Sequence, residues 1–322
     1  MYKRQEQNLS SPLPYKHISV AADEAVTYIK QRKNHEIEPL KSRWNKFNFM
    51  CCGGIEPGCV YTIVGASGTG KSSFVNTLET DLIELNPDKE LVVLSFSFEM
   101  LSSRQVGRKL SNKLRHTTSE LYSASEDVSD SLLQDIEKEV EVIKQYPIYY
   151  VDESATVSKI EDTITYFQNT IAKDKWLIIF LDHTLLVEGN DTNDERKIIA
   201  ALERVFIRAK KVGKTSIIQL SQMNRNIEMP ERIINPSSHY PMRSDLSSSD
   251  SVFQGSDVIA VLSRPETLGI TAYGPSRLPV QNKVYLHFLK VREGKLAILE
   301  YENDLQYNNL IEVDRSENKP QY

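Results

Sequence analysis

Apolar residues along the chain fall into short runs separated by helical periods. Six runs have the length of a strand: Val60–Val64, Leu91–Phe98, Ile148–Val151, Trp176–Leu181, Ser216–Leu220 and Val258–Leu262. Between them, apolar residues recur every three or four positions, as from Leu132 to Ile143 and from Val157 to Ile171, which puts them on one face of a helix. Short buried strands alternating with amphipathic helices predict an α/β fold, with a mostly parallel central sheet flanked by helices.

The two ends of the chain have weaker patterns. A weak helical period runs from Ala21 to Arg32, and near the other end Val284–Val291 and Leu296–Tyr301 flank a glycine turn, the pattern of a C-terminal β-hairpin. We therefore expect a tail, helix and linker over residues 1–42, one α/β domain over residues 43–302, and a polar tail over residues 303–322.

The first five residues, Met1-Tyr2-Lys3-Arg4-Gln5, allow two interpretations. They match a translated transposon-end adapter from a sequencing library, which would make them non-native, and they also match an ordinary polar tail. Both interpretations stay open, so these residues do not enter the fold prediction.

A long segment from Met223 to Ser256 has no sustained apolar period and contains three prolines. Connections of this length inside a compact domain are usually functional or disordered. We expect one of these two outcomes here.

The composition and charge of the chain exclude several classes of protein. The 322 residues include 39 Lys and Arg against 44 Asp and Glu, a net charge of −5, which excludes a uniformly basic nucleic-acid coat. With 40% hydrophobic and 26% charged residues the chain can bury a core. No apolar run approaches the ~18 residues of a membrane span, the N-terminal residues are polar, and Cys51, Cys52 and Cys59 cluster without CxxC spacing. These features predict a cytoplasmic protein without a membrane partner.

A glycine-rich sequence follows the first predicted strand and precedes a helical segment. Residues 65–72 fit the P-loop pattern G-x-x-x-x-G-K-[ST]. In a P-loop, backbone N–H groups point at phosphate oxygens, the lysine reaches the β and γ phosphates, and the Ser hydroxyl ligates magnesium. A chance glycine-rich turn, the alternative, would not require a strand and a helix on its two sides. We expect ATP, with Mg²⁺, to bind at Gly65, Ala66, Ser67, Gly68, Thr69, Gly70, Lys71, Ser72 and Ser73.

Two acidic residues follow predicted strands. Asp182 ends the hydrophobic run Leu177–Leu181, so we expect it to be the second magnesium anchor beside Ser72, although strands also often end at an Asp in a turn. Glu99 ends the run Leu91–Phe98, at the sheet edge where open α/β folds bind ligands. It is the candidate base that activates water; an ordinary solvated charge is the alternative.

Five motifs in register resemble one family. They are Gly53–Gly58 before the P-loop, Ser97-Phe98-Glu99-Met100, Ser221–Arg225, Ser244-Asp245-Leu246 with Gln254 and Asp257, and Lys290–Gly294. Their order resembles the ATPase domain of replicative hexameric DNA helicases of the DnaB type, over about Arg43 to Glu302. This resemblance implies a RecA-like P-loop NTPase core.

The same resemblance implies roles for the motif residues. Glu99 would activate water, Gln222 would sense the γ-phosphate, and Lys290 with Arg292 would reach the ATP of a neighbouring subunit. A guanidinium supplied across an interface is known to stabilise the transferred phosphoryl group. Without the resemblance, Lys290 and Arg292 would be interpreted as two solvated hairpin charges.

Members of this family hold one DNA strand with loops of a central channel, and the sequence departs from them there. After Ser-Asp-Leu they carry a basic residue, an acidic residue and a glycine, where this chain has Ser247, Ser248 and Asp250. Serine hydroxyls and backbone N–H groups can still hold phosphates. We expect DNA contacts at Arg225, Ser247, Ser248, Ser249 and Asp250. The cluster Lys210, Lys211 and Lys214 is either a second nucleic-acid contact or a solvated helix end.

The resemblance implies an ATP-dependent DNA helicase that forms a ring of identical subunits, six in the family, and acts on single-stranded DNA, with a primase or a loader as further partners. Two alternatives stay open: a recombinase-like or clock-like oligomeric ATPase, and a nucleotide-switched scaffold without unwinding activity. The family's N-terminal collar domain has no counterpart in the sequence, either because the protein never had one or because the reading frame begins after it.

Overall fold

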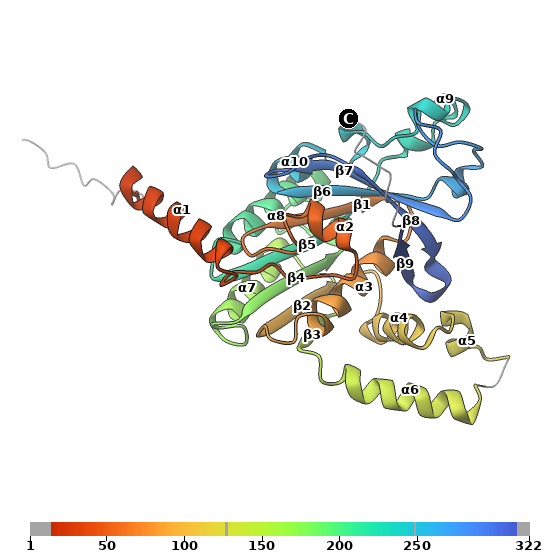
Figure 1. Cartoon of the computed structure of the whole chain (residues 1–322), viewed down its shortest axis with the longest axis horizontal. Coiled ribbons are helices and arrows are strands. Elements are labelled where there is room, and N and C mark those ends of the chain that lie inside the picture. Colours follow the sequence, from red (N-terminus) through yellow and green to blue (C-terminus); the bar gives the residue numbers. More distant parts are fainter. Residues whose placement is uncertain (1–13, 126–127, 248, 314–322) are drawn as a thin grey trace, which may run out of the picture. The chain divides into compact units, whose positions relative to one another are not determined.

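The computed structural model describes residues 14–125, 128–247 and 249–313 (Figure 1). The predictions for Met1–Gln5 and Ser248 lie outside these residues. The chain divides into two units, Met1–Glu38 and Pro39–Tyr322. The first unit contains α1 (Ile18–Lys33), in agreement with the predicted helix. The His17 side chain accepts a hydrogen bond from Ser19 N, and three basic residues in the last turn complement the helix dipole.

The second unit is built on one nine-stranded sheet with the order β3-β2-β4-β5-β1-β6-β7-β8-β9. The first six strands in this order are parallel, and β7, β8 and β9 add an antiparallel extension. All six predicted strands and the predicted hairpin are confirmed. The strands are β1 (Val60–Gly65), β2 (Leu91–Ser97), β3 (Ile148–Val151), β4 (Trp176–Asp182), β5 (Lys214–Gln222), β6 (Val258–Ser263), β7 (Lys283–Val291), β8 (Ile298–Asp304) and β9 (Asn309–Glu312).

Helices connect the strands and cover both faces of the sheet (Figure 1). They are α2 (Asn45–Met50), α3 (Lys71–Glu84), α4 (Ser102–Leu114), α5 (Thr118–Tyr122), α6 (Asp130–Ile143), α7 (Val157–Asn169), α8 (Glu195–Ala209), α9 (Pro230–Ile234) and α10 (Ser249–Gly255). Single 3₁₀ turns are η1 (Thr184–Leu186), η2 (Arg225–Glu228), η3 (Pro236–Ser238), η4 (Arg243–Asp245), η5 (Pro265–Leu268) and η6 (Leu305–Tyr307). The predicted helices at Leu132–Ile143 and Val157–Ile171 correspond to α6 and α7.

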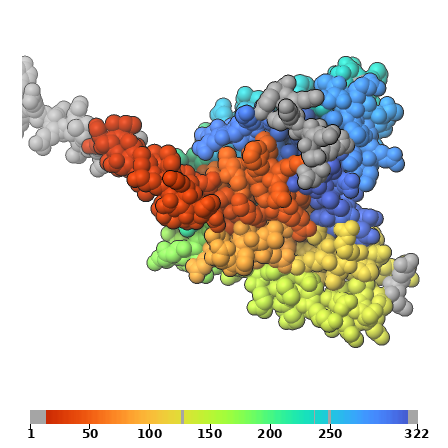
Figure 2. Space-filling model, viewed as in Figure 1, coloured from red at the N-terminus to blue at the C-terminus, as the bar shows by residue number. Residues whose placement is uncertain are grey.

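Alternate side chains of each strand enter different hydrophobic layers. In β4, Ile178 and Phe180 pack with α2 and α3 on one face, whereas Leu177 and Ile179 pack with α7 and α8 on the other. Strands buried on both faces therefore appear in the sequence as continuous apolar runs. Figure 2 shows the yellow segment that contains α4 to α6 as a surface layer next to the orange segment that contains α3.

The sheet extends beyond the boundary expected at Glu302. The predicted polar tail contains β9, which pairs with β8, and the carbonyl of Leu310 accepts a hydrogen bond of 2.9 Å from the indole of Trp44. The Trp44 ring stacks on Phe74 of α3 at a centroid distance of 4.3 Å. A four-residue strand is too short to give a clear period in the sequence, and its burial depends on residues far away along the chain.

Short helices and turns, rather than a structureless loop, occupy the described part of Met223–Ser256. The guanidinium of Arg232 organises them. It donates to Asp245 Oδ1 at 2.6 Å, to Ser238 O at 2.7 Å and to Tyr240 O at 2.9 Å. The buried apolar residues of this segment, such as Leu246 and Val252, follow no sustained helical period in the sequence, so hydrophobic periodicity does not detect the segment.

Candidate nucleotide site and nucleic-acid interface

The P-loop lies between β1 and α3, as its pattern predicts. Gly70 caps α3 with φ +94°, a backbone conformation that favours glycine, and a Cβ atom there would lie 2.6 Å from Leu305 Cδ2. The Thr69 hydroxyl closes the loop by donating to Ala66 O at 2.9 Å. The loop therefore presents the backbone N–H groups at the start of α3, the geometry that binds phosphates.

The ammonium of Lys71 lies across this loop. It donates to Gly65 O and to Ala66 O, both at 2.8 Å. Burial lowers the pKa of Lys71, while the carboxylates of Asp182 and Glu99 raise it. Two carbonyl partners and two nearby carboxylates favour the charged form, which a phosphate would also favour.

Ser72 and Asp182, the two predicted magnesium residues, lie in contact. The Ser72 hydroxyl bonds to the Asp182 carboxylate, and burial followed by the charge of Glu99 raises the pKa of Asp182. One hydroxyl and one carboxylate are hard oxygen donors that fit Mg²⁺, which usually takes one or two protein ligands and completes its coordination with phosphates and water. Among the described residues no group of three or more His, Cys, Asp and Glu side chains could hold a metal. The site thus fits a metal bound together with the nucleotide.

His183 connects two predicted catalytic residues, and the motifs did not point to it. Its Nδ1 accepts a hydrogen bond from Leu185 N at 3.2 Å, which fixes the orientation of the ring, and its other nitrogen, Nε2, faces the site. That atom lies 3.8 Å from Glu99 Oε2 and 3.1 Å from the side-chain amide of Gln222. Burial lowers the pKa of His183, while the carboxylates of Asp182 and Glu99 raise it. Its only signal in the sequence is a polar residue directly after the strand-end Asp182.

The turn that contains Glu99 is fixed by its neighbours. The Ser97 hydroxyl donates to Met100 O at 2.5 Å and accepts from Gln105 Nε2 at 3.0 Å. Glu99 itself is exposed at the carboxyl end of β2, where Ser97 pairs with Asp182 in register. The serine of the Ser-x-Glu-Met element therefore has a structural role.

A further cation, Arg108 in α4, faces the same carboxylates. Burial lowers its pKa, and the charges of Asp182 and Glu99 raise it. Its Nη1 atom is buried without a hydrogen-bond partner in the described part of the chain. Nothing in the sequence pointed to it except that it lies about one helical turn after Gln105.

The P-loop lies at the carboxyl ends of the parallel strands. Lys290 and Arg292 lie at the opposite edge of the sheet, where the amino ends of these strands are. Val291 pairs with Val258 at the beginning of β6, whereas Gly65 pairs with Leu262 near its end. Four residues of strand separate these positions by about 13 Å at ~3.3 Å per residue. The two side chains therefore cannot serve the P-loop of the same chain together with Lys71.

Asp257 holds this opposite edge together. Its backbone carbonyl accepts from Arg292 N at 2.9 Å, and its Oδ1 lies 3.0 Å from Arg292 Nε. Its other carboxylate oxygen accepts from Val60 N at 2.8 Å and from the ammonium of Lys210. The structure thus favours an intramolecular ion pair for Lys210 over the nucleic-acid contact considered from sequence, because its side chain is largely buried.

The predicted DNA loop is hydrogen-bonded to the end of β5. Ser247 N donates to Gln222 O at 3.1 Å, and Asn224 N donates to Asp245 O at 2.8 Å. Arg225 is exposed beside it, and Ser249 begins α10. The carboxylate of Asp250 accepts from Arg243 at 2.7 Å. A contact at this loop would therefore act directly on the strand that carries Gln222.

Comparison with known families identifies the second unit. The model of the DnaB-like helicase C terminal domain matches residues 39–311. The chain belongs to this family. Two solved structures share the fold with a TM-score of 0.75 and 19% identity over 91% of this chain. One is described as an ATPase domain and is covered over 98% of its length. The other, a DnaB-like replicative helicase described with its interactions with primase, is covered over 66%. No curated protein matches significantly.

The comparisons settle the family and the fold of this DnaB-like domain: a RecA-like α/β core with antiparallel C-terminal strands. The structure brings Lys71, Ser72, Glu99, Asp182 and Gln222 to one sheet edge, and their roles stay predictions. None of the described helices is long and apolar enough to cross a membrane.

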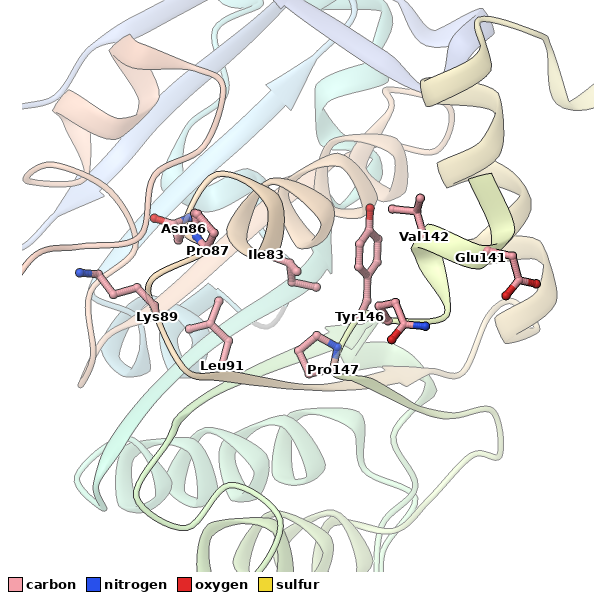
Figure 3. A pocket seen from close by; sticks show the side chains of 10 residues that line it. Ile83, Asn86, Pro87, Lys89, Leu91, Glu141, Val142, Tyr146 and Pro147 are labelled. Carbon is pink, nitrogen blue, oxygen red and sulfur yellow. The ribbon is translucent and has the colours of Figure 1, made fainter. Parts of the chain in front are cut away.

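A groove of about 650 Å³ lies away from this edge (Figure 3). Leu91 begins β2 and Pro147 precedes β3, so the groove is at the amino ends of the strands. Leu133 and Val142 of the adjacent helix α6 are about half exposed. None of the predicted site residues lines the groove. The lining residues are Ile83, Asn86, Pro87, Lys89, Leu91, Glu141, Val142, Gln145, Tyr146 and Pro147.

Proposed function

We propose that this DnaB-like domain is an ATP-dependent DNA helicase whose nucleotide sites are completed across subunit interfaces. The observation that supports this most is the separation of its charged groups. Lys71, Ser72 and Glu99 lie at one edge of the sheet, and Arg292 lies at the other, held by Asp257. A ring in which the second edge of one subunit faces the first edge of the next would unite them.

The residues at the P-loop edge suit phosphoryl transfer to water. Ser72 and Asp182 would hold Mg²⁺, which neutralises phosphate charge when it is bound with ATP. Lys71 would stabilise the same phosphates. Glu99 is exposed and can orient or deprotonate a water. The ring of His183 lies next to the side chains of Glu99 and Gln222, with Nε2 at 3.8 Å from Glu99 Oε2 and 3.1 Å from Gln222 Nε2, and would help to position them.

The basic residues of the hairpin would act on the neighbour's nucleotide. The ion pair with Asp257 fixes the Arg292 backbone and its Nε, while the side chain remains half exposed. An arginine finger of this kind is worth ~10³–10⁵ in rate. Six subunits, a central strand of DNA and a primase or loader as partner are part of the proposal. Membership of the DnaB-like family supports it, as does the neighbour described with its interactions with primase.

Two other functions remain as competitors: a recombinase-like or clock-like oligomeric ATPase, and a nucleotide-switched scaffold. The departures at Ser247 and Asp250 favour them. The complete hydrolytic set of Lys71, Glu99 and Asp182 favours the motor, because a passive scaffold needs no such set.

The decisive experiment measures ATP turnover with and without single-stranded DNA, together with the mass of the particle by light scattering and unwinding of a forked duplex. We expect DNA-stimulated turnover by a ring and strand separation. Turnover and assembly without any effect of DNA would support the oligomeric ATPase, and nucleotide binding without turnover would support the scaffold.

A further inference from the structure

The loop expected to face DNA has one cation close to it that the motif comparison did not select. Arg243 is the only Lys or Arg in the sequence from Met242 to Asp250. It lies in η4, four positions before Ser247, and its guanidinium pairs with Asp250 at 2.7 Å. Both side chains are exposed, Arg243 by 52% and Asp250 by 80%.

The ring of Phe253 supports the same guanidinium from one side. The Arg243 Cζ lies 4.4 Å from the ring centroid. A guanidinium that lies over a ring keeps the N–H groups along its edge free for planar, bidentate partners such as carboxylate or phosphate. Arg243 is therefore held in one place while its donors stay accessible.

The partner that Arg243 has in the chain is easily replaced. Exposed ion pairs contribute little to stability, because water solvates both charges and the side chains lose entropy. A phosphate offers the same acceptor geometry as the Asp250 carboxylate. The segment is also connected to the nucleotide edge, since Ser247 N bonds to Gln222 O.

We propose that Arg243 binds a backbone phosphate of single-stranded DNA, and that Asp250 competes with the DNA for it. This inference rests on the proposed helicase function and names a contact within it. Asp250 then acts as an internal anion that weakens the contact, rather than as a contact itself, and the cation of the DNA loop comes from the turn before it.

The test is a salt titration of a labelled oligothymidylate with a non-hydrolysable ATP analogue, read by fluorescence anisotropy. Five proteins are compared: wild type, Arg243→Gln, Arg243→Lys, Asp250→Asn and the control Arg208→Gln. Arg208 is a matched control because it is also an exposed arginine paired with a carboxylate, that of Glu161, but lies in α8.

Arg243→Gln should weaken binding about tenfold, the value of one charge-assisted contact, and should reduce the logarithmic salt slope by about 0.7. Asp250→Asn should tighten binding about threefold, because it removes the competing anion. Arg243→Lys keeps the positive charge, so the salt slope should stay that of the wild type. This result would show that the charge contacts a phosphate, whereas a purely structural role of the guanidinium would not depend on the charge alone. Arg208→Gln should match the wild type.

If wild type and Arg243→Gln bind equally and have the same slope, the inference is wrong while the helicase proposal stands. If none of the proteins binds, including Asp250→Asn, the inference and the DNA contact of the proposed function both fail. ATP turnover of the same five proteins, measured in parallel with ATP in place of the analogue, then tells whether the nucleotide site is intact.

Discussion

The ammonium of Lys290 lies 5.2 Å from the centre of the Phe253 ring and donates a hydrogen bond to the backbone carbonyl of Phe253. Arg243 lies over this ring as well. One residue of α10 is therefore in contact with the predicted finger and with the turn before the DNA loop. The ring of Phe253 therefore links the turn before the predicted DNA loop to Lys290.

Phe253→Leu should reduce the stimulation of ATP turnover by DNA about two- to fivefold, the worth of an exposed cation–π contact. Turnover without DNA should change little, because the carbonyl partner of Lys290 remains. The measurement is steady-state hydrolysis at saturating and at zero oligonucleotide. Equal stimulation in variant and wild type would show that α10 does not connect the two regions.

Glu99→Gln should keep nucleotide binding and lose about 10²–10⁴ of the turnover rate, the usual contribution of a positioned base. Glutamine fills the same space next to His183 but cannot accept a proton. Binding is read with a fluorescent ATP analogue, and turnover by phosphate release. Loss of binding together with turnover would instead assign Glu99 a structural role.

Mixing two inactive variants should restore part of the activity. Lys71→Ala removes the cation of the P-loop edge, and Arg292→Ala removes the cation of the opposite edge. In a mixed ring some interfaces combine an intact P-loop with an intact finger, so turnover should exceed the sum of the separate activities. Subunit exchange is verified by energy transfer between labelled subunits; exchange without any gain would argue against a shared site.

Glu203 should make the stability of the protein fall as the pH rises. Burial raises the pKa of this carboxyl in α8 to about 8, and only one of its oxygens has a partner in the described part of the chain, Gln219 Nε2 at 2.6 Å. Between its ordinary pKa and pH 8 the folded chain keeps a proton that the unfolded chain releases. The free energy of unfolding therefore loses up to about 1.4 kcal/mol per pH unit over this window.

Glu203→Gln removes this dependence, so its advantage over the wild type should grow from pH 5 to pH 8. Urea unfolding at a series of pH values measures it, with Glu137→Gln, at an exposed site in α6, as the control. Parallel pH profiles for Glu203→Gln and wild type would mean that Glu203 is ionised in the folded chain.

Local patterns predicted much of this molecule because the P-loop and the parallel strands are determined by nearby residues. The positions of Lys71, Ser72 and Asp182 at one edge follow from strands that end together, so their proximity could be foreseen. Two of their neighbours could not be foreseen. His183 and Arg108 gain their environment from burial between elements that are distant in the sequence.

The opposite edge of the sheet shows more clearly which contacts the sequence motifs cannot predict. The resemblance suggested that Arg292 acts on another subunit, but only the strand register gives a physical reason, since Val291 pairs with Val258 at the far end of β6. The ion pairs of Asp257 with Lys210 and Arg292 also depend on this register. A sequence interpreted one segment at a time contains no information about such pairs.

The contact between Trp44 and Leu310 has a consequence for how the protein is made. The two residues are 266 positions apart, and Trp44 stacks on Phe74 of the P-loop helix. During synthesis, the first half of the sheet leaves the ribosome long before β9 exists. Until β9 forms, the aromatic side chains packed against α3 are not fully buried. Exposed apolar surface of this kind favours aggregation and chaperone binding. Complete packing of the core of this domain therefore requires almost the last described residues of the chain.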